Sequence, residues 1–302
     1  MTTPQLRASD FLPMPRAFLG MPAQEAGSWQ SAKAVIIPFG LERSVSYGGG
    51  TARGPAAIIK ASPQLEMFDE ELWCETYRKI GIATMKPARI KPKLPAALTQ
   101  LAQSVEKVLN AGKFPLTLGG EHSLTAGAIR PFAARHKRLT LLHFDAHADL
   151  RDGYEGEPFS HAAALRRCLD YPNVRLVSLG IRNISASEIP FLEANRRRIK
   201  IFWAKDKAKW RLDAILRAIG SGPVYLTFDV DGFDSALMPA TGTPEPGGLW
   251  WDETMTIIRA AARLAPIIGA DVVELAPRPG LHSCDFLAAK LVYKILGYSF
   301  RL

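Results

Sequence analysis

The stretch 141–150 places three metal-type ligands directly after an apolar run. It reads Leu-Leu-His-Phe-Asp-Ala-His-Ala-Asp-Leu, so Asp145, His147 and Asp149 alternate with alanines. A β-strand sends every second side chain to the same face. These three groups therefore converge on one point if the strand runs extended to its end.

A second stretch repeats this design, and a third is related to it. Residues 224–231 read Val-Tyr-Leu-Thr-Phe-Asp-Val-Asp, which puts Asp229 and Asp231 two residues apart after an apolar run. His122 follows a double glycine after the apolar run 114–118. Together these are more ligands than one divalent ion needs, so the first hypothesis is a two-metal hydrolytic site.

The candidate ligand set combines oxygen and nitrogen donors without sulfur: His122, Asp145, His147, Asp149, Asp229 and Asp231. Carboxylates and imidazoles suit Mn²⁺ well, and other divalent ions can also bind them. A capping or buried hydrogen-bonded role is the alternative for any single member. For the whole set that alternative is weak, because four carboxylates need a cation to offset their repulsion.

Three further histidines are less suited to direct ligation. His143 is in register with Asp145 but lies one step deeper in the expected strand, which favours a supporting role behind the ligands. His136 and His282 lie in polar contexts and are expected at the surface.

Two residues could act on a substrate beside such ions. His161 ends the polar loop that follows the opening stretch and could relay a proton to a leaving amine, with a loop or cap role as an equal alternative. Glu274 ends an apolar run and could bind a guanidinium group through two charge-assisted hydrogen bonds. Asp271 is either another partner for that cation or a structural group.

Alternating strands and helices must position these residues. Apolar runs predict strands at 34–39, 80–84, 114–118, 138–144, 174–179, 199–203, 224–230 and 267–275. Helical spacing predicts helices at 56–61, 96–109, 124–134, 162–169, 187–195, 212–219, 254–264 and 286–296. The alternation predicts an α/β fold with a mainly parallel sheet covered on both faces, and ligands beyond the carboxyl ends of its strands.

Other segments are expected to frame this fold. Residues 1–31 form an expected N-terminal arm before a single domain, 32–302. The glycine-rich loop 44–54 is expected to approach the active-site mouth or a neighbouring subunit closely. Asp252 is a candidate N-cap for the helix at 254–264.

Composition disfavours several other classes of protein. The chain has 302 residues, 47% of them hydrophobic, which suffices for a substantial core. The net charge of +9 is spread over short runs without a nucleic-acid-binding signature, so solvated basic faces are expected. The three cysteines are far apart, and neither a signal peptide nor a membrane-spanning run is evident, which together favour a cytoplasmic location.

Three motifs taken together resemble those of the ureohydrolases, the arginase and agmatinase family. They are Gly-Gly-Glu-His-Ser (119–123), Phe-Asp-Ala-His-Ala-Asp (144–149), and Thr-Phe-Asp-Val-Asp (227–231) with the tail 241–248. The match runs from about Val35 to Tyr298. The loop 46–55 and the segment Phe-Ser-His-Ala (159–162) are most similar to the agmatinase branch.

This resemblance implies a three-layer α/β/α fold around a binuclear manganese centre. It assigns one ion to His122, Asp145, Asp149 and Asp229, and the other to Asp145, His147, Asp229 and Asp231. A hydroxide shared by the two ions would attack the guanidinium carbon, and urea and an amine would leave. Asp149 would help with proton transfer, His161 would pass a proton to the amine, and Glu274 would anchor the guanidinium.

Departures from the family pattern are mild. Glu121 stands where Asp or Asn is frequent, Thr227 where Ser is common, and Pro239-Ala240 where Pro-Gly is more usual. None of them removes a ligand, so the resemblance implies an active enzyme whose substrate depends on the surrounding loops.

The loop 151–160 bears on the choice of substrate. It carries Asp152, Glu155 and Glu157, and acidic groups near the mouth would favour the second cation of agmatine. A solvated loop face is their more ordinary role, and Arg151 opposes the inference. Agmatine, cleaved to putrescine and urea in polyamine biosynthesis, is therefore expected first, with guanidinobutyrate or another guanidino compound as the alternative.

Two other functional classes fit less well. A metal-dependent deacetylase of related fold would carry paired histidines, and a non-catalytic scaffold would lack ligands. The resemblance also implies a homotrimer or homohexamer without nucleic-acid or membrane partners. Residues 1–30 and the pair Trp250-Trp251 could supply subunit contacts, although burial in the core is the plainer expectation for the tryptophans.

Overall fold

A parallel sheet lies at the centre of the structure, a computed structural model that describes residues 5–22 and 28–302. Within these residues, eight strands pair in the order β4-β1-β5-β10-β9-β6-β7-β8, and every neighbouring pair is parallel. The strands are β1 (Ala34–Phe39), β4 (Ile82–Thr84), β5 (Phe114–Gly119), β6 (Leu139–Phe144), β7 (Val174–Ile181), β8 (Ile199–Trp203), β9 (Val224–Asp229) and β10 (Ile267–Val273). The central strands β5, β10, β9 and β6 therefore end at one edge of the sheet.

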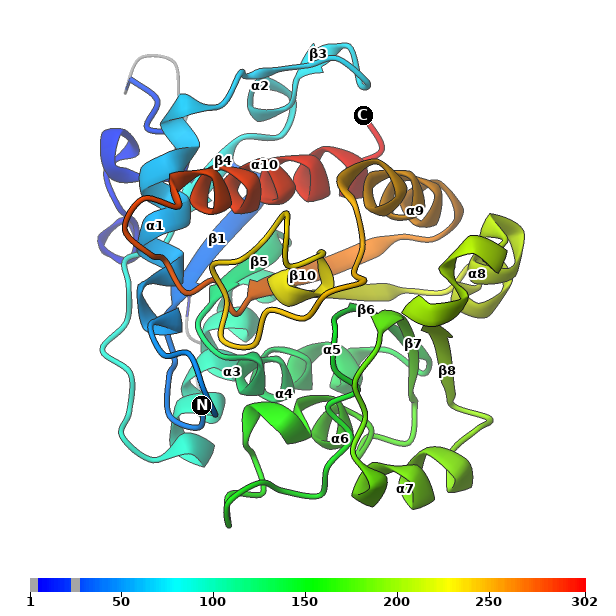
Figure 1. The fold of residues 1–302 in the computed structure, drawn as a ribbon. Coiled ribbons are helices and arrows are strands. Elements are labelled where there is room, and N and C mark those ends of the chain that lie inside the picture. The colour runs from blue at the N-terminus through cyan, green and yellow to red at the C-terminus, as the bar shows by residue number, and fades with distance from the viewer. Residues whose placement is uncertain (1–4, 23–27) are drawn as a thin grey trace.

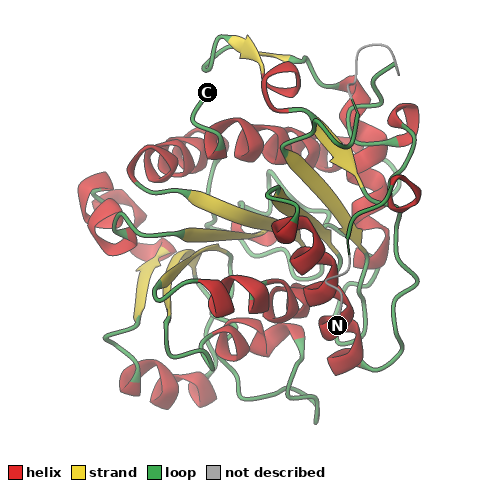
Figure 2. Cartoon of the chain, turned by 180° about the vertical axis from the view of Figure 1, so that it is seen from behind, coloured by secondary structure: helices red, strands yellow, loops and turns green. Residues whose placement is uncertain are grey.

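Helices cover both faces of this sheet, as Figures 1 and 2 show from opposite sides. One face carries α1 (Gly54–Ala61), α2 (Thr76–Ile80), α8 (Leu212–Ile219), α9 (Trp251–Leu264) and α10 (His282–Ser299). The other carries α3 (Leu94–Asn110), α4 (Thr125–Ala128), α5 (Arg130–Arg135), α6 (Ala164–Cys168) and α7 (Ile189–Ala194). The predicted α/β/α layers are confirmed. None of these helices, in the described ranges, is both long and apolar enough to cross a bilayer.

A short antiparallel pair, β2 (Phe68–Asp69) and β3 (Cys74–Glu75), lies outside the main sheet. Trp73 between these strands is 78% exposed, and its ring meets that of Phe68 edge-on at 5.3 Å. This small hairpin therefore presents aromatic side chains on the surface.

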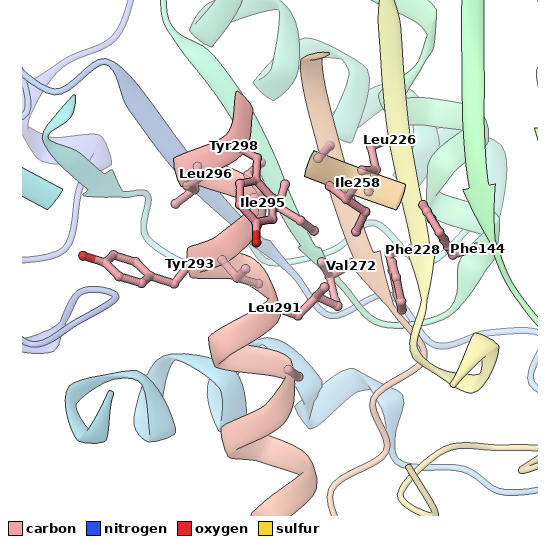
Figure 3. Close-up of a cluster of buried hydrophobic side chains, with 14 of the residues drawn as sticks. Phe144, Leu226, Phe228, Ile258, Val272, Leu291, Tyr293, Ile295, Leu296 and Tyr298 are labelled. Atoms are coloured by element: carbon pink, nitrogen blue, oxygen red, sulfur yellow. The ribbon is translucent and has the colours of Figure 1, made fainter. Parts of the chain in front are cut away.

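Alternate side chains of the strands supply the two halves of the core. In β6, Leu142 and Phe144 face the cluster beneath α9 and α10, whereas Leu139 and Leu141 face the cluster beneath α3. Figure 3 shows the first cluster, in which the rings of Phe144 and Phe228 stack with centroids 5.0 Å apart. Each large apolar side chain contributes about 1.5–3 kcal/mol when it is fully buried. The strand ends that carry the ligands thus rest on two packed layers.

A proline interrupts one predicted helix. The range 124–134 contains two helices, α4 and α5, which break at Ile129. Pro131 has no N–H to continue the helical hydrogen bonds, so one continuous helix is disfavoured. The range 187–195 likewise begins as a 3-10 turn, Ala186–Glu188, before α7.

The start of α9 differs from the prediction. The helix begins at Trp251, and Asp252 lies inside its first turn, so the assignment of Asp252 as N-cap is wrong. The side chain of Glu253 accepts a hydrogen bond from the backbone N–H of Trp250 at 2.7 Å, which sets the helix start. Trp250 is also 52% exposed, so the core position expected for it is wrong.

Four strands are shorter than predicted: those at 138–144 and 224–230 by one residue each, and those at 80–84 and 267–275 by two. The strand expected at 80–84 begins at Ile82, because α2 runs to Ile80 and ends at Gly81 with a φ of 62°. The strand expected at 267–275 ends at Val273. The two larger differences arise where left-handed backbone or a short helix interrupts an apolar run.

The predicted arm 1–31 is described in part. Residues 1–4 and 23–27 lie outside the described residues. Phe18 and Leu19 are 1% and 2% exposed and belong to the cluster beneath α10. The described part of the arm therefore contributes to the core of its own chain.

Candidate metal centre and active site

Four neighbouring strand ends supply the site. The residues that follow β5, β10, β9 and β6 meet at one edge of the sheet, as expected for ligands beyond the carboxyl ends of parallel strands. The structure brings together all the predicted ligands and the predicted guanidinium anchor: His122, Asp145, His147, Asp149, Asp229, Asp231 and Glu274.

The buried imidazole of His122 lies among three carboxylates. Its Nδ1 atom is 3.1 Å from Oδ2 of Asp145, 3.1 Å from Oδ2 of Asp149 and 3.4 Å from Oδ2 of Asp229. Nδ1 nevertheless has no hydrogen bond of acceptable geometry within the described part of the chain. A buried nitrogen without a partner, surrounded by carboxylate oxygens, is the arrangement of a ligand set for a cation.

The other ring nitrogen of His122 is held from behind. Nε2 lies 2.9 Å from Oγ1 of Thr227, and this hydroxyl donates its hydrogen to Oδ1 of Asp271 at 2.6 Å. Thr227 must therefore accept a hydrogen from Nε2, which leaves Nδ1 as the ligand atom.

A second group forms around His147. Its Nδ1 atom lies 3.0 Å from Oδ2 of Asp231 and 3.6 Å from Oδ1 of Asp145. Asp145 thus directs Oδ2 toward His122 and Oδ1 toward His147. Asp145 therefore lies between the two imidazole groups and could contribute to both halves of a two-metal site.

Backbone N–H groups orient three of the aspartates by bonding one oxygen of each. Oδ1 of Asp145 accepts from the N–H of His147 at 2.6 Å, and Oδ1 of Asp229 accepts from that of Asp231 at 2.9 Å. Oδ1 of Asp231 accepts from the N–H of the residue after Asp145 at 3.0 Å. A Cβ on Gly232 would lie 2.8 Å from the backbone nitrogen of Asp145, so only glycine lets these two strand ends approach so closely.

Asp149 reaches the group by a route that strand periodicity does not predict. Strand β6 ends at Phe144, and Asp149 has a left-handed φ of 52°. The expectation that one extended strand aligns these ligands is therefore wrong, although their side chains do meet. Glu274, directly after β10, likewise has a φ of 65°. Such backbone costs about 1–3 kcal/mol per residue and is typical of functional sites.

His143 lies behind the ligands, as predicted. It is fully buried, with Nε2 2.8 Å from Oδ2 of Asp145 and Nδ1 2.9 Å from Oγ of Ser178. Both ring nitrogens thus have partners, and the ring orients Asp145. His282 is exposed as expected, whereas His136 is half-buried.

Burial and mutual repulsion set the protonation of the group. Burial lowers the pKa of His122, but its contacts with three aspartates raise this pKa well above the ordinary value. Burial also lowers the pKa of His147, but its contacts with Asp231 and Asp145 outweigh burial and raise this pKa to about 12. Burial, Asp231 and Asp145 raise the pKa of Asp229 well above its usual range. The metal-free group therefore holds protons that a bound cation would displace.

The donor set fits a pair of divalent ions. It offers four carboxylates and two imidazoles, without thiolates, around the free Nδ1 of His122. Oxygen and imidazole donors suit Mn²⁺ and related ions, and the cations would relieve the repulsion among the buried carboxylates.

A cavity of about 320 Å³ opens beside the ligand group. His161 and Glu274 line it together with five of the six ligands, all except Asp145. The ring of His161 meets that of Tyr154 edge-on at 6.0 Å. His161 thus lines the same cavity as the ligands.

Glu274 and Asp271 have different environments. Glu274 is 7% exposed, its Oε1 accepts from the backbone N–H of His122 at 2.6 Å, and burial raises its pKa well above the usual range. Asp271 is fully buried and does not line the cavity. It accepts hydrogen bonds from the hydroxyls of Thr125, Tyr225 and Thr227. Of the two alternatives for Asp271, the structural one is supported.

The acidic side chains of the loop 151–160 do not line the cavity. Asp152 pairs with Arg167 at 2.7 Å, and Oε1 of Glu157 accepts from the N–H of Phe159 at 3.0 Å. From this loop, Arg151 and Tyr154 line the cavity instead. The structure therefore supports the solvated-face alternative for these carboxylates, and they give no argument for a cationic substrate.

Two supporting residues escaped sequence reasoning. Glu188, 3% exposed, accepts from the N–H groups of Leu150 at 2.7 Å and Ser185 at 2.6 Å. It thereby ties the opening stretch to the chain after β7, and burial raises its pKa. Arg182 donates to the carbonyl of Asp231 at 2.7 Å and to others nearby. The sequence signal that could have identified Arg182 is its position directly after the apolar strand β7.

Comparisons with known proteins agree with this site. The chain matches the family model described as "Arginase family" over residues 32–297. An N(1)-aminopropylagmatine ureohydrolase from Synechocystis sp. is 36% identical, covering 94% of each chain. A guanidinobutyrase from Pseudomonas aeruginosa is 30% identical, covering 90% of this chain and 88% of that protein. The solved agmatine ureohydrolase of Thermoplasma volcanium has a TM-score of 0.83 at 28% identity, covering 95% of this chain and 94% of its own.

The family resemblance inferred from the three motifs is thereby confirmed. The family model spans the whole sheet, and a relative of similar length is more than a third identical in sequence. The fold and the cluster of histidines and aspartates agree with that assignment. The chain belongs to the arginase family, the hydrolases that act on the amidine C–N bonds of guanidino compounds with two metal ions.

Proposed function

We propose that the chain is a manganese-dependent ureohydrolase that cleaves an aminoalkylguanidine into urea and an amine. Agmatine, which would give putrescine, or its aminopropyl derivative is the proposed substrate. The observation that carries the proposal is the unpartnered Nδ1 of His122 among the carboxylates of Asp145, Asp149 and Asp229, with Glu274 on the same cavity.

Each ion has a proposed set of ligands. His122, Asp145, Asp149 and Asp229 would hold one, and Asp145, His147, Asp229 and Asp231 would hold the other. Lewis acidity, which makes water nucleophilic at neutral pH, is the chemistry that two bound Mn²⁺ ions supply. The division of Asp145 between two imidazoles supports its assignment to both sets.

Glu274 is the proposed partner of the guanidinium. Its carboxylate is nearly buried and is anchored to the backbone N–H of His122, so it has little freedom to turn away. A guanidinium offers paired N–H donors that match a carboxylate. Burial raises the pKa of Glu274, and a bound guanidinium would favour the ionised carboxylate again. The same contact would place the reacting carbon beside the ligand group.

Proton transfer is assigned to Asp149 and His161. Asp149 has a carboxylate oxygen 3.1 Å from Nδ1 of His122 and lines the cavity, so it can take up a proton as the carbon becomes tetrahedral. His161 lines the same cavity and would give a proton to the departing amine. The two roles need opposite proton movements, so two different side chains would carry them.

The rest of the cavity lining supports a long, polar substrate. It includes neutral polar groups such as Ser46, Asn183, Ser185 and Thr243, together with the ring of Tyr47, which is 85% exposed. Hydroxyl and amide oxygens can accept from an ammonium group, and an aromatic ring can attract it. The similarity to an aminopropylagmatine ureohydrolase supports the same substrate class.

One observation favours a second candidate. Arg151 lines the cavity, and its guanidinium lies 5.2 Å from the ring centroid of Tyr154. An arginine on the cavity lining would attract the carboxylate of a guanidino acid such as guanidinobutyrate. The chain is also similar to a guanidinobutyrase.

Urea release from a substrate panel separates these candidates. The manganese-loaded chain would be assayed with agmatine, N(1)-aminopropylagmatine, guanidinobutyrate and arginine. The proposal predicts the highest kcat/KM for one of the first two. A clear preference for guanidinobutyrate would select the second candidate, and failure to release urea from any of the four would contradict both.

A further inference from the structure

A buried carboxylate clamps the glycine-rich loop to the active site. Glu121 is fully buried, and its Oε2 accepts from the backbone N–H groups of Arg43 at 2.5 Å and Ser44 at 2.7 Å. Its Oε1 accepts from the hydroxyls of Ser44 at 2.9 Å and Ser123 at 2.5 Å. Four donors thus meet one carboxylate: two belong to Ser44 at the start of the loop, and one to Arg43 directly before it.

The same loop holds His161. Oγ of Ser44 accepts from the backbone N–H of His161 at 2.9 Å and lies 3.4 Å from its Nδ1. Oγ of Ser46 lies 3.5 Å from its Nε2. Two serines of one loop therefore face the two ring nitrogens of the proposed proton donor.

The donors and acceptors of this chain of contacts can be assigned. A serine hydroxyl has one hydrogen. Ser44 gives it to Glu121, because a carboxylate bonded by four donors can only accept. Ser44 can therefore only accept from His161, so the hydrogen between them belongs to Nδ1. Neutral His161 is then the Nδ1–H tautomer, with the lone pair of Nε2 on the side of Ser46.

We propose that Glu121 and Ser44 are positioning residues that fix the tautomer and orientation of His161, so that Nε2 is the atom that exchanges a proton with the leaving amine. The proposal rests on the proposed function for the identity of that amine. Neither residue needs to touch the substrate. Their effect passes through the Nδ1–H of His161, which they hold in place.

The proton step then has a defined direction. Protonated His161 carries hydrogens on both nitrogens. As the C–N bond breaks, its electron pair goes to the amine nitrogen, which takes the proton from Nε2. His161 is left neutral with its hydrogen on Nδ1, still bonded to Ser44. The opposite tautomer would leave Nε2 occupied and unable to take up the next proton.

The length of the Glu121 side chain suits this arrangement. The backbone N–H of Glu121 donates to the carbonyl of Leu41 at 2.7 Å, and a Cβ on Gly120 would lie 2.0 Å from that carbonyl. The backbone position is thus set by close contact, and the carboxylate must reach the loop from it. An aspartate is one methylene shorter, so Glu121→Asp should weaken the contact with Ser44.

Nitrogen NMR of the histidines tests the tautomer directly, without any substrate. The full chain would carry ¹⁵N-labelled histidine and Zn²⁺, which is diamagnetic, and the His161→Asn variant would assign one ring among the six histidines. The wild type should show His161 with protonated Nδ1. In Glu121→Gln the amide NH₂ should face the hydroxyls, so Ser44 would donate to Nδ1 and the ring should switch to Nε2–H. A wild-type ring in the Nε2–H form, or an unchanged tautomer in Glu121→Gln, would overturn the proposal.

Kinetics with a matched pair of variants supplies the second test. Ser44→Ala removes the acceptor, whereas Ser44→Thr keeps a hydroxyl at this half-buried position. Loss of such a supporting contact typically costs about 10–100-fold. We expect that loss in kcat for Ser44→Ala with KM little changed, and recovery to within about 3-fold of wild type for Ser44→Thr. An unaltered kcat in Ser44→Ala would overturn the positioning role. If the wild type released no urea, the proposed function would fail while the NMR result would still decide the tautomer.

Discussion

Nδ1 of His122 and Oδ2 of Asp145 lie 3.1 Å apart, although β5 and β6, which precede them, are three positions apart in the sheet. Neighbouring strands are separated by about 4.8 Å, so these two strands lie roughly 14 Å apart. The turns after them must therefore fold toward each other across the ends of β10 and β9. Glu274 and Asp229 lie at the ends of those two middle strands, so they are already positioned between His122 and Asp145.

Metal binding should release protons and weaken as the pH falls. The pKa of His147 is raised to about 12 and that of His122 well above its ordinary value, so the metal-free site holds protons that a metal must displace. Lowering the pH favours the protonated forms and so opposes the metal. Calorimetric titration of the metal-free chain with Mn²⁺ between about pH 6.5 and 8.5, in two buffers of different ionisation enthalpy, measures both effects. An affinity independent of pH would contradict this picture.

The variant His161→Asn should lose turnover rather than substrate binding. General acid catalysis contributes about 10²–10⁴-fold, so kcat should fall within that range while KM changes little. Steady-state urea production measures both constants. His282→Asn is the matched control, because that histidine is exposed and should retain wild-type activity. Equal kcat values for His161→Asn and the control would exclude the proton relay.

The variant Glu274→Gln should weaken substrate binding. It keeps the shape of the side chain but removes the charge that pairs with the guanidinium. Hydrogen bonds to charged groups contribute about 1.5–3 kcal/mol, so kcat/KM should fall about 10–150-fold, mainly through KM. Metal content measured on the same sample should remain at the wild-type level. A variant with unchanged KM would show that Glu274 does not anchor the substrate.

The three motif stretches were predictable from the sequence because each follows a buried strand. In a parallel sheet, consecutive strand ends share an edge, so His122, Asp145 and Asp229 could be expected to meet without knowing the strand order. Asp149 was predicted for the wrong reason, since its left-handed backbone, rather than strand alternation, turns it inward. That φ depends on tertiary contacts that a local pattern does not contain.

The supporting contacts could not be predicted. Ser44 and His161 are far apart in the chain, and only the folded loop brings them within hydrogen-bonding distance. The acidic loop residues were equally ambiguous, because a carboxylate can face a cavity or pair with an arginine, as Asp152 does. Local signals also missed the start of α9, where Glu253 rather than Asp252 bonds the free N–H group.

The variant Lys294→Ala should destabilise the fold away from the active site. The ammonium of Lys294 is 1% exposed and lies 2.9 Å from Oδ1 of Asp69, whose side chain is fully buried. Removing one partner of a buried pair typically costs about 3–5 kcal/mol, because the other charge remains unpaired. Urea-induced unfolding of the metal-loaded chain measures this loss. Arg211→Ala, which removes an exposed partner of Asp213, should leave the free energy of unfolding nearly unchanged, because solvent screens this pair. Equal losses of unfolding free energy in the two variants would show that the buried Lys294 ion pair stabilises the fold no more than an exposed pair does.

The most direct test combines metal content and urea release for Asp145→Ala, since Asp145 contacts both imidazole groups. Wild-type chain dialysed after loading should retain about two Mn²⁺ ions and release urea from a guanidino substrate. Asp152→Ala, which alters an exposed carboxylate on the adjoining loop, should behave like wild type. Asp145→Ala should lose both the retained metal and the activity. Two retained ions and wild-type urea release in Asp145→Ala would contradict the proposed two-metal site.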